Sequence, residues 1–411
     1  MIRFILLIWC VLNPSLAARN ISAGDGGQYA RIAEAITYAE PGDTVTVRSG
    51  YYAQGNIIID KRLTLRGEGT VVLDGKYRYE VISVKADSCV IEGLTIQKSG
   101  YSTMNDPGGI KVYDVRDVII RNNILDDNFF GIYLQYATQC RVQGNRIRAY
   151  GKEEQRIGNG IHCWKCDSIM IIGNIIEGHR DGIYFEFVTH SLIWRNISTG
   201  NKRYGLHFMF SNDDWYVANV FRRNGAGVAV MFTKKVTMLA NTFEQNWGDA
   251  AYGLMLKEIA DSYIEGNRFL KNTSGIYMEG TSRISVKNNL FEGNGWGMKI
   301  QASCMDNRIT ACNFIANTFD VSTNGLLVLN VFEKNYWDGY EGYDVDRDGT
   351  GDIPHRPLSM YAVIAERNPQ AMIVFRSLFV SLLDKSEKII PSITPKAFVD
   401  NTPRMRKYPL W

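Results

Sequence analysis

A glycine recurs through the middle of the chain at a nearly constant spacing. It stands at Gly109, Gly131, Gly160, Gly182, Gly205, Gly227, Gly253, Gly275 and Gly297, in steps of 22, 29, 22, 23, 22, 26, 22 and 22 residues. A constant period with two longer steps is typical of stacked coils with loop insertions, which fall here near residues 150–158 and 247–252. The spacing predicts an all-β fold, a right-handed parallel β-helix with rungs about every 22 residues.

Two columns of asparagine follow the same period. Asn196, Asn219, Asn241, Asn267 and Asn289 are each followed five residues later by another asparagine, at Asn201, Asn224, Asn246, Asn272 and Asn294. Asparagine tolerates left-handed backbone angles and can hydrogen-bond to its copy on the next rung, so such columns mark the corners of a solenoid. We expect these side chains to be structural and not catalytic.

The strand after each glycine alternates between two kinds of residue. Its first and third residues are apolar, as in Ile183 and Phe185, and we expect them to face the interior. The second and fourth residues then face outward, with rungs about 4.8 Å apart, so that neighbouring rungs can touch. The middle of this outward face gathers His162, Trp164, Tyr184, Glu186, His207, Met209, Met231 and Met255.

The outward imidazole and thioether groups suggest a metal. Such soft ligands favour Cu(I), whereas carboxylate-rich sites favour calcium or magnesium. The candidate copper ligands are His162, His207, Met209, Met231 and Met255. The alternative is an apolar patch that docks a partner protein, with Trp164, Tyr184 and Glu186 among its contacts. The two interpretations are compatible, because a site that passes copper on must also dock its donor.

A carbohydrate-binding or polysaccharide-modifying protein, of the lyase or epimerase kind, is the rival function. Acid–base cleavage of a uronate needs a base together with charge-neutralising cations or calcium near one rung. Glu186 with His162 or His207 could serve as the base, but no Asp cluster or Arg and Lys pair accompanies them. Methionine offers a sugar only a weak hydrogen-bond acceptor. The residues therefore favour a protein that is not an enzyme.

The N-terminal region predicts export and a cap. A basic residue, an apolar run over residues 4–12 and small residues up to Ala18 are typical of a signal peptide over residues 1–17. Residues 18–50 read as a cap and first strand, with a helix over 28–39 covering the open end of the solenoid, and residues 51–337 as the β-helix. Six cysteines follow the signal, and some could pair in an oxidising compartment. The net charge of +3 is small and does not indicate a strongly basic face, so nucleic acid is not an expected partner.

Residues 338–356 hold an acidic turn. Asp344, Asp346, Asp348 and Asp352 stand at positions one, three, five and nine of a calcium-loop pattern, with Gly349 at position six. Position twelve, however, is a histidine and not the usual bidentate glutamate. The pattern predicts a short calcium turn of structural role, or the same turn solvated without an ion.

Residues 357–411 change in composition. Residues 370–383 predict a very apolar helix, which is too short to span a bilayer because a span needs about 20 residues. We expect this helix either to dock into a membrane-bound transporter or to fold back as a cap, followed by an extended proline-rich tail. The expected docking residues are Met372, Phe375, Leu378, Phe379 and Leu382.

The last third of the chain also carries specific motifs. Asn-Tyr-Trp-Asp at 335–338 is followed by Gly-Tyr-Asp at 342–344 and Asp-Gly at 348–349. Gly-Asp-Ile-Pro-His-Arg-Pro at 351–357 and Glu-Arg-Asn-Pro at 366–369 complete the series. In these motifs the chain resembles the NosD family, the periplasmic maturation factors of nitrous oxide reductase. The resemblance covers the exported solenoid and is most specific over the last 80 or so residues.

This resemblance implies a non-enzymatic role in the periplasm. Proteins of the NosD family work with an ABC transporter, its permease and its ATPase, and help to deliver copper for the metal centres of nitrous oxide reductase. Copper would come from a membrane-anchored lipoprotein chaperone, and the apolar C-terminal helices would be the anchor on the transporter. The resemblance supplies no copper ligands residue by residue, so the proposed ligands rest on the outward columns.

Overall fold

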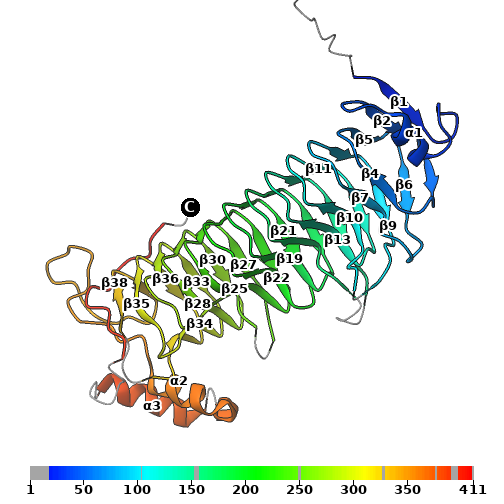
Figure 1. The fold of residues 1–411 in the computed structure, drawn as a ribbon. Helices are drawn as coiled ribbons and strands as arrows, with labels where there is room; N and C mark the ends of the chain where they lie inside the picture. The colour runs from blue at the N-terminus through cyan, green and yellow to red at the C-terminus, as the bar shows by residue number, and fades with distance from the viewer. Residues whose placement is uncertain are drawn as a thin grey trace, which may run out of the picture.

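The chain winds into a solenoid built from three parallel β-sheets (Figure 1). The computed structural model describes residues 18–102, 104–151, 157–248, 251–325, 329–374, 377–389 and 397–409, so the expected signal peptide at 1–17 lies outside the described residues. A 14-stranded sheet runs from β1 (Asn20–Ala23) to β38 (Leu329–Glu333), and a 13-stranded sheet runs from β3 (Gly50–Tyr52) to β39 (Tyr336–Trp337). The predicted right-handed parallel β-helix is confirmed.

The 12-stranded sheet carries the outward columns. Its strands are β4 (Ile57–Ile59), β7 (Ile82–Val84), β10 (Gly108–Tyr113), β13 (Phe130–Gln135), β16 (Ile161–Trp164), β19 (Asp181–Glu186), β22 (Tyr204–Met209), β25 (Ala226–Lys234), β28 (Leu254–Ala260), β31 (Ser274–Glu279), β34 (Trp296–Ile300) and β37 (Phe319–Ser322). The recurring glycines lie at the start of these strands because successive rungs approach closely there. A Cβ atom on Gly227, for example, would lie 2.2 Å from the carbonyl oxygen of Gly253.

The asparagine columns form hydrogen-bonded ladders, as predicted. Asn196 Nδ2 donates to Asn219 Oδ1 at 3.0 Å, and Asn219 donates in the same way to Asn241 at 3.0 Å. The left-handed backbone angle, however, belongs to the residue before each ladder asparagine, as at Arg195 (φ 54°) and Ala218 (φ 52°). The expectation that the asparagines adopt this angle themselves was therefore wrong by one position.

The interior is a column of stacked apolar side chains. The rings of Phe243 and Phe269 lie 4.7 Å apart at an interplanar angle of 3°, and Phe291 continues the stack at 4.9 Å. The stack ends on Trp337, whose ring lies 4.2 Å from that of Phe314. Stacked identical side chains bury their faces against each other from rung to rung, which fixes the register of the coils.

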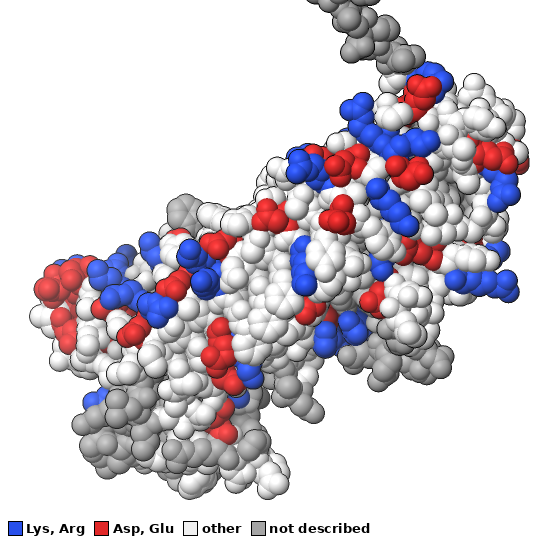
Figure 2. All heavy atoms as spheres, viewed as in Figure 1, with Lys and Arg blue, Asp and Glu red and all other residues white. Residues whose placement is uncertain are grey.

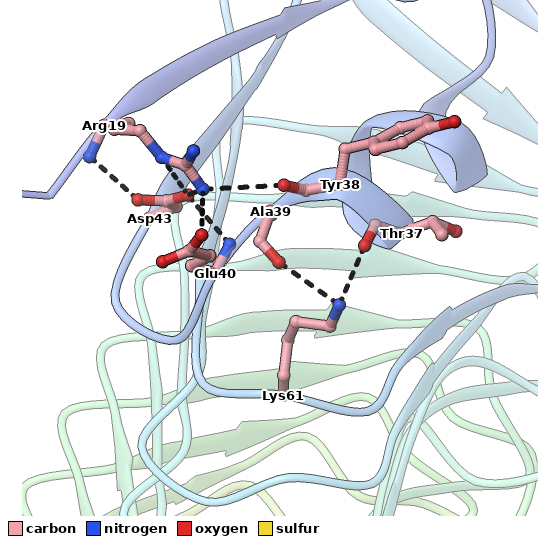
Figure 3. A network of polar contacts seen from close by, with 7 residues as sticks. All are labelled: Arg19, Thr37, Tyr38, Ala39, Glu40, Asp43 and Lys61. Carbon is pink, nitrogen blue, oxygen red and sulfur yellow. Dashed lines mark hydrogen bonds and ion pairs between the residues drawn. The ribbon is translucent and has the colours of Figure 1, made fainter.

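Polar contacts hold the N-terminal cap on the first rungs (Figure 3). Arg19 binds the buried carboxylate of Asp43 through Nη2 at 2.7 Å, and this hydrogen bond holds the pKa of Asp43 at about 2. Lys61 donates to the carbonyl oxygens of Thr37 and Ala39 at the end of helix α1 (Ile32–Tyr38). The helix is shorter than predicted. The strands β1 and β2 (Thr44–Val47) belong to the 14-stranded sheet and β3 begins at Gly50, so the sheets start before residue 51.

The C-terminal helices lie against the far end of the solenoid (Figure 1). They are α2 (Met360–Arg367), a 3₁₀ helix (Pro369–Val374) and α3 (Leu378–Ile389), so residues 370–383 do not form the single helix that was predicted. The inner face of α2 is buried through Tyr361 and Ala362. Among the described residues, no helix is long and apolar enough to cross a membrane.

Part of the tail closes the C-terminal end of the solenoid. Asp400 is fully buried and accepts hydrogen bonds from the Asn335 backbone at 3.0 Å and from Trp337 Nε1 at 3.1 Å. It thereby takes the position that the next ladder asparagine would occupy. Tyr408 adds a backbone hydrogen bond to Asn313 Oδ1 at 2.9 Å. Residues 397–409, the described part of the proline-rich tail, are therefore packed against the end of the solenoid.

The surface mixes both signs of charge. Basic and acidic side chains lie side by side on the face shown in Figure 2, and acidic groups gather at the C-terminal end. The six cysteines after the predicted signal are all buried free thiols.

Candidate metal site on the 12-stranded sheet

The two outward columns are in register, as their spacing predicted. Tyr133, His162, Tyr184 and His207 are direct neighbours on successive rungs, and Ala229 and Met255 continue the same column. In the second column Trp164 pairs with Glu186, Glu186 with Met209, and Met209 with Met231. We call His207, Met209, Met231 and Met255 the Met–His cluster.

Much of the outward face is covered, which the alternating pattern did not predict. His207 and Met255 are only 5% and 6% exposed, and Ala229 between them is fully buried. Tyr204, which opens β22, contributes to the cover, because its ring lies 4.8 Å from the imidazole of His207. The second column is more open, and Met209 and Met231 are half-buried.

His207 is held by a buried carboxylate. Its Nδ1 lies 3.6 Å from Asp181 Oδ2, and Asp181 is fully buried in an ion pair with Arg203. Burial opposes the ionisation of Asp181, but the hydrogen bonds from Arg203 and His207 outweigh it, so the pKa of Asp181 lies below its usual value. Arg203 Nη2 also lies 3.5 Å from Nδ1 and can only donate, so two groups compete for this nitrogen. The Asp181 carboxylate favours the tautomer with the proton on Nδ1, as in many metal-binding histidines, whereas Arg203 favours the proton on Nε2.

The other ring nitrogen of His207, Nε2, is the atom that could bind a metal. Nε2 is buried and makes no hydrogen bond within the described part of the chain. A buried polar atom without a partner costs free energy, roughly 1–3 kcal/mol, and calls for an explanation. With the proton on Nδ1, the Nε2 lone pair is available to a ligand. This donor fits a soft metal ion, since the neighbouring Met209 thioether is a soft donor as well.

His162 belongs to a different environment from His207. The ring of Tyr184 lies between the two imidazoles, with centroids 4.8 Å from His162 and 4.9 Å from His207. Asn159 Nδ2 lies 3.0 Å from His162 Nδ1 and can donate to it. Burial lowers the pKa of His162 to about 3, aided by the positive charge of Arg180. The five candidate copper ligands therefore do not all come together, because His162 is separated from the other four.

Met231 and Met255 also line a pocket of about 630 Å³. Its walls include Tyr252 and Trp296 on the sheet side and Glu366 of α2 on the other. Lys299 joins the two walls, because its Nζ lies 2.8 Å from Glu366 Oε2. Helix α2 thus borders the pocket that contains two members of the Met–His cluster.

Sequence reasoning missed an aromatic ridge beside the cluster. Phe187, Phe210 and Phe232 stand one residue after the fourth strand position, with stacked rings 5.1 and 5.3 Å apart, and each is 38–45% exposed. All three adopt left-handed backbone angles of 50–54°, which bulky residues rarely do. The recurrence of Phe every 22 or 23 residues was the available signal. Trp164 extends this surface on the neighbouring rung, where its ring lies 4.9 Å from Tyr136.

The acidic turn and helix α3 contribute no described residue to the pocket that contains Met231 and Met255. Carboxylate oxygens of Asp344, Asp346 and Asp348 lie within 4.8 Å of one another, whereas Asp352 accepts from the backbone of Val345 at 2.7 Å. Calcium binding there stays a prediction. On α3, the expected docking residues Leu378, Phe379 and Leu382 are 54–76% exposed. The side chains of Met372 and Phe375 lie outside the described residues.

Comparison with known proteins shows a similarity to one family. The model of the family described as "Periplasmic copper-binding protein (NosD)" matches residues 148–342, the rungs that carry the Met–His cluster. A Pseudomonas aeruginosa protein named "Probable ABC transporter binding protein NosD" is 29% identical over 95% of this chain and 97% of its own length. The chain is thus similar to the NosD family over most of its length. A second NosD relative, from Stutzerimonas stutzeri, is 28% identical over 86% of this chain and 85% of its own length.

Solved structures of other proteins share the fold of this chain. The family 28 exopolygalacturonase of Yersinia enterocolitica superposes with a TM-score of 0.53 at 11% identity, over 75% of each chain. The A-module of the Azotobacter vinelandii mannuronan C-5 epimerase AlgE4 superposes with a TM-score of 0.51 at 15% identity, over 72% of this chain and 86% of the module. Likeness at such low identity shows a common β-helix and nothing about the reaction.

Proposed function

We propose that this protein is a periplasmic accessory protein that receives Cu(I) and delivers it for assembly of the metal centres of nitrous oxide reductase, without being an enzyme itself. It would work with an ABC transporter, its permease and its ATPase, and take copper from a lipoprotein chaperone. The family description names copper binding, and the relatives are named as ABC transporter binding proteins. The signal peptide over residues 1–17 would account for export.

One observation carries the proposal. Asp181 lies beside His207 Nδ1, and Nε2 of the same ring is buried without a hydrogen-bond partner among the described residues. His207 stands two residues before Met209, which lies opposite Met231 on the next rung. An imidazole nitrogen and two thioethers form a donor set suited to Cu(I). The neutral thioethers hold copper without a thiolate, which suits a protein that must release its cargo.

The surroundings of the cluster suit transfer between proteins. The ridge of Phe187, Phe210 and Phe232 offers an exposed apolar surface directly beside Met209 and Met231, where a copper donor would dock. The exposed side chains of α3 offer a separate apolar surface for the transporter. The helices α2 and α3 would thus connect the transporter to the wall of the pocket that contains Met231 and Met255.

Anaerobic titration of the full mature chain with Cu(I), against a competing chelator, tests the proposal. We expect stoichiometric binding that a Met209→Ala and Met231→Ala double variant weakens by about tenfold or more, equivalent to roughly 1.4 kcal/mol. Met305→Ala is the matched control, because Met305 is exposed on the 14-stranded sheet, away from the cluster. Absence of Cu(I) binding, or equal weakening by the control, would exclude the Met–His cluster as the copper site.

A further inference from the structure

A second, polar cleft opens at the N-terminal end of the same sheet face. It has a volume of about 370 Å³ and lies over β4, β7 and β10, and its lining includes residues 78–80, 100–102, 105 and 107. Ser83 and Lys85 of its floor stand in the same two columns as His207 and Met209, several rungs away. Tyr133 and His162 lie between the two sites, so the cleft is separate from the Met–His cluster.

The floor of the cleft is a connected hydrogen-bond network. The hydroxyl of Tyr113 lies 2.9 Å from Glu80 Oε2, and the hydroxyl of Ser83 also donates to Glu80. Asn56 Nδ2 donates to Ser83 Oγ at 2.9 Å. Burial raises the pKa of Glu80, against the effect of these hydroxyls and of the nearby lysines. The network presents carboxylate, hydroxyl and amide groups within one small depression, which is a mixture of donors and acceptors.

Two cations contribute to the cleft, and one of them, Lys85, acts through its charge on the nearby Glu80 carboxylate. Lys85 and Arg78 both line it, and neither forms an ion pair within the described part of the chain. The Lys85 ammonium instead lies over the ring of Tyr113, 5.5 Å from its centroid. Lys111 nearby is already used, because it donates to the backbone carbonyl of Asn105 at 2.9 Å. The cleft therefore holds positive charge that a ligand can neutralise.

Aromatic side chains form the rim. Tyr79 and Tyr101 are 43% and 51% exposed, although each carries a large ring. Aromatic rings beside the carboxylate and amide groups of the floor provide apolar contact for a ligand that has an apolar ring face and polar groups around it. A simple anion such as phosphate would pair only with the cations and would be repelled by the Glu80 carboxylate. A purely apolar ligand would leave the polar groups of the floor without hydrogen-bond partners from the ligand.

We propose that this cleft binds an oligosaccharide that carries carboxylate groups. The sugar carboxylate pairs with Lys85 and Arg78, vicinal hydroxyls bond to Glu80, Ser83 and Asn56, and a ring face lies on Tyr79. This binding is independent of copper handling. It would attach the solenoid to an acidic polysaccharide at the N-terminal end, leaving the Met–His cluster and the C-terminal helices free.

Calorimetric titration of the full mature chain with trigalacturonate tests the inference, with cellotriose as the neutral sugar and triglutamate as the acidic peptide. We expect trigalacturonate alone to bind. Lys85→Gln and Glu80→Gln should each weaken it by about tenfold, the usual effect of losing a hydrogen bond to a charged group. The control is Lys257→Gln, since Lys257 stands in the same column as Lys85 but beside Met231. A circular dichroism spectrum confirms that each variant is folded.

Each alternative outcome overturns the inference. Equal binding of cellotriose removes the role of the cations, and equal binding of triglutamate shows an anion site without sugar recognition. No binding by any probe, or equal weakening by Lys257→Gln, shows that the cleft is not the site. Because Met209→Ala should leave trigalacturonate binding unchanged, failure here and failure of the copper proposal are distinguishable.

Discussion

Met209 and Met231 lie directly opposite each other on β22 and β25, on the outer face of the 12-stranded sheet. Both are half-buried, and the Tyr184 hydroxyl lies 3.6 Å from the sulfur of Met209. Paired methionines beside exposed phenylalanines could serve either to bind metal or to dock a protein through apolar contact. Replacement by leucine separates these roles, because leucine keeps the volume and loses the thioether.

We therefore predict that a Met209→Leu and Met231→Leu variant loses Cu(I) affinity by about tenfold or more while its folded stability changes by less than about 1.5 kcal/mol. Competition with a Cu(I) chelator measures the affinity, and thermal unfolding measures the stability. If the leucine variant binds Cu(I) as tightly as the wild type, the two methionines serve docking alone.

The two histidines of the outward column should differ in effect. His207 has a buried Nε2 without a hydrogen-bond partner in the described part of the chain. Tyr184, in contrast, separates His162 from the Met–His cluster, and Asn159 lies beside Nδ1 of His162. We predict that His207→Gln weakens Cu(I) binding by about tenfold and that His162→Gln changes it by less than about twofold. The same chelator competition checks both variants. A larger loss from His162→Gln would mean that copper binds nearer the N-terminal end of the column.

The exposed apolar side chains of α3 should hold the transporter. Changing Leu378, Phe379 and Leu382 together to serine removes an exposed apolar surface without disturbing a buried residue. We predict that this variant stays folded and no longer co-purifies with the transporter. Serine at Ile124 and Ile175, which are 48% and 40% exposed on the 13-stranded sheet, is the control. Substitution is a sharper test than deletion of residues 370–411, because deletion would also remove Asp400 from the end of the ladder.

Asp214 should give the stability of the solenoid a distinct pH dependence. It is fully buried, and burial raises its pKa from the ordinary 3.8 to about 8. The folded state therefore keeps a proton that the unfolded chain releases, so this contribution to stability is complete below about pH 4 and is lost as the pH rises toward 8. We predict that the wild type loses about 1.4 kcal/mol per pH unit relative to Asp214→Asn in this interval.

Urea unfolding of both proteins at pH 5 and at pH 7, a span of about two pH units within that interval, measures the difference in the free energy of unfolding. The control is Asp213→Asn, since Asp213 is the neighbouring residue and its partly exposed side chain lies 3.7 Å from Lys235. Parallel pH profiles for the wild type and Asp214→Asn would show that Asp214 is ionised in the folded state.

The sequence was most informative where one rung determines the next. The period of the glycines and the alternation of side chains predicted the register that pairs Met209 with Met231 and Tyr184 with His207. Burial was less predictable, because the groups that cover His207 come from the starts of strands and from neighbouring rungs. The carboxylate of Asp181, 26 residues before His207 along the chain, has no periodic signal that marks it as a partner.

Contacts over long sequence separations were missed for the same reason. Asp400 completes the asparagine ladder at Asn335, 65 residues earlier in the chain, and Glu366 reaches Lys299 across the pocket. Neither residue belongs to the repeat, so only the folded chain brings them together. Their positions explain why the C-terminal region acts as a cap and pocket wall as well as a candidate docking surface.

The most direct test of copper handling is the anomalous scattering of crystals of the Cu(I)-loaded protein, measured at the copper edge. The account predicts one strong peak beside the sulfurs of Met209 and Met231 and the Nε2 atom of His207. A peak at the acidic turn of Asp344, Asp346 and Asp348, or at His162 alone, would contradict the assignment of the Met–His cluster as the copper site.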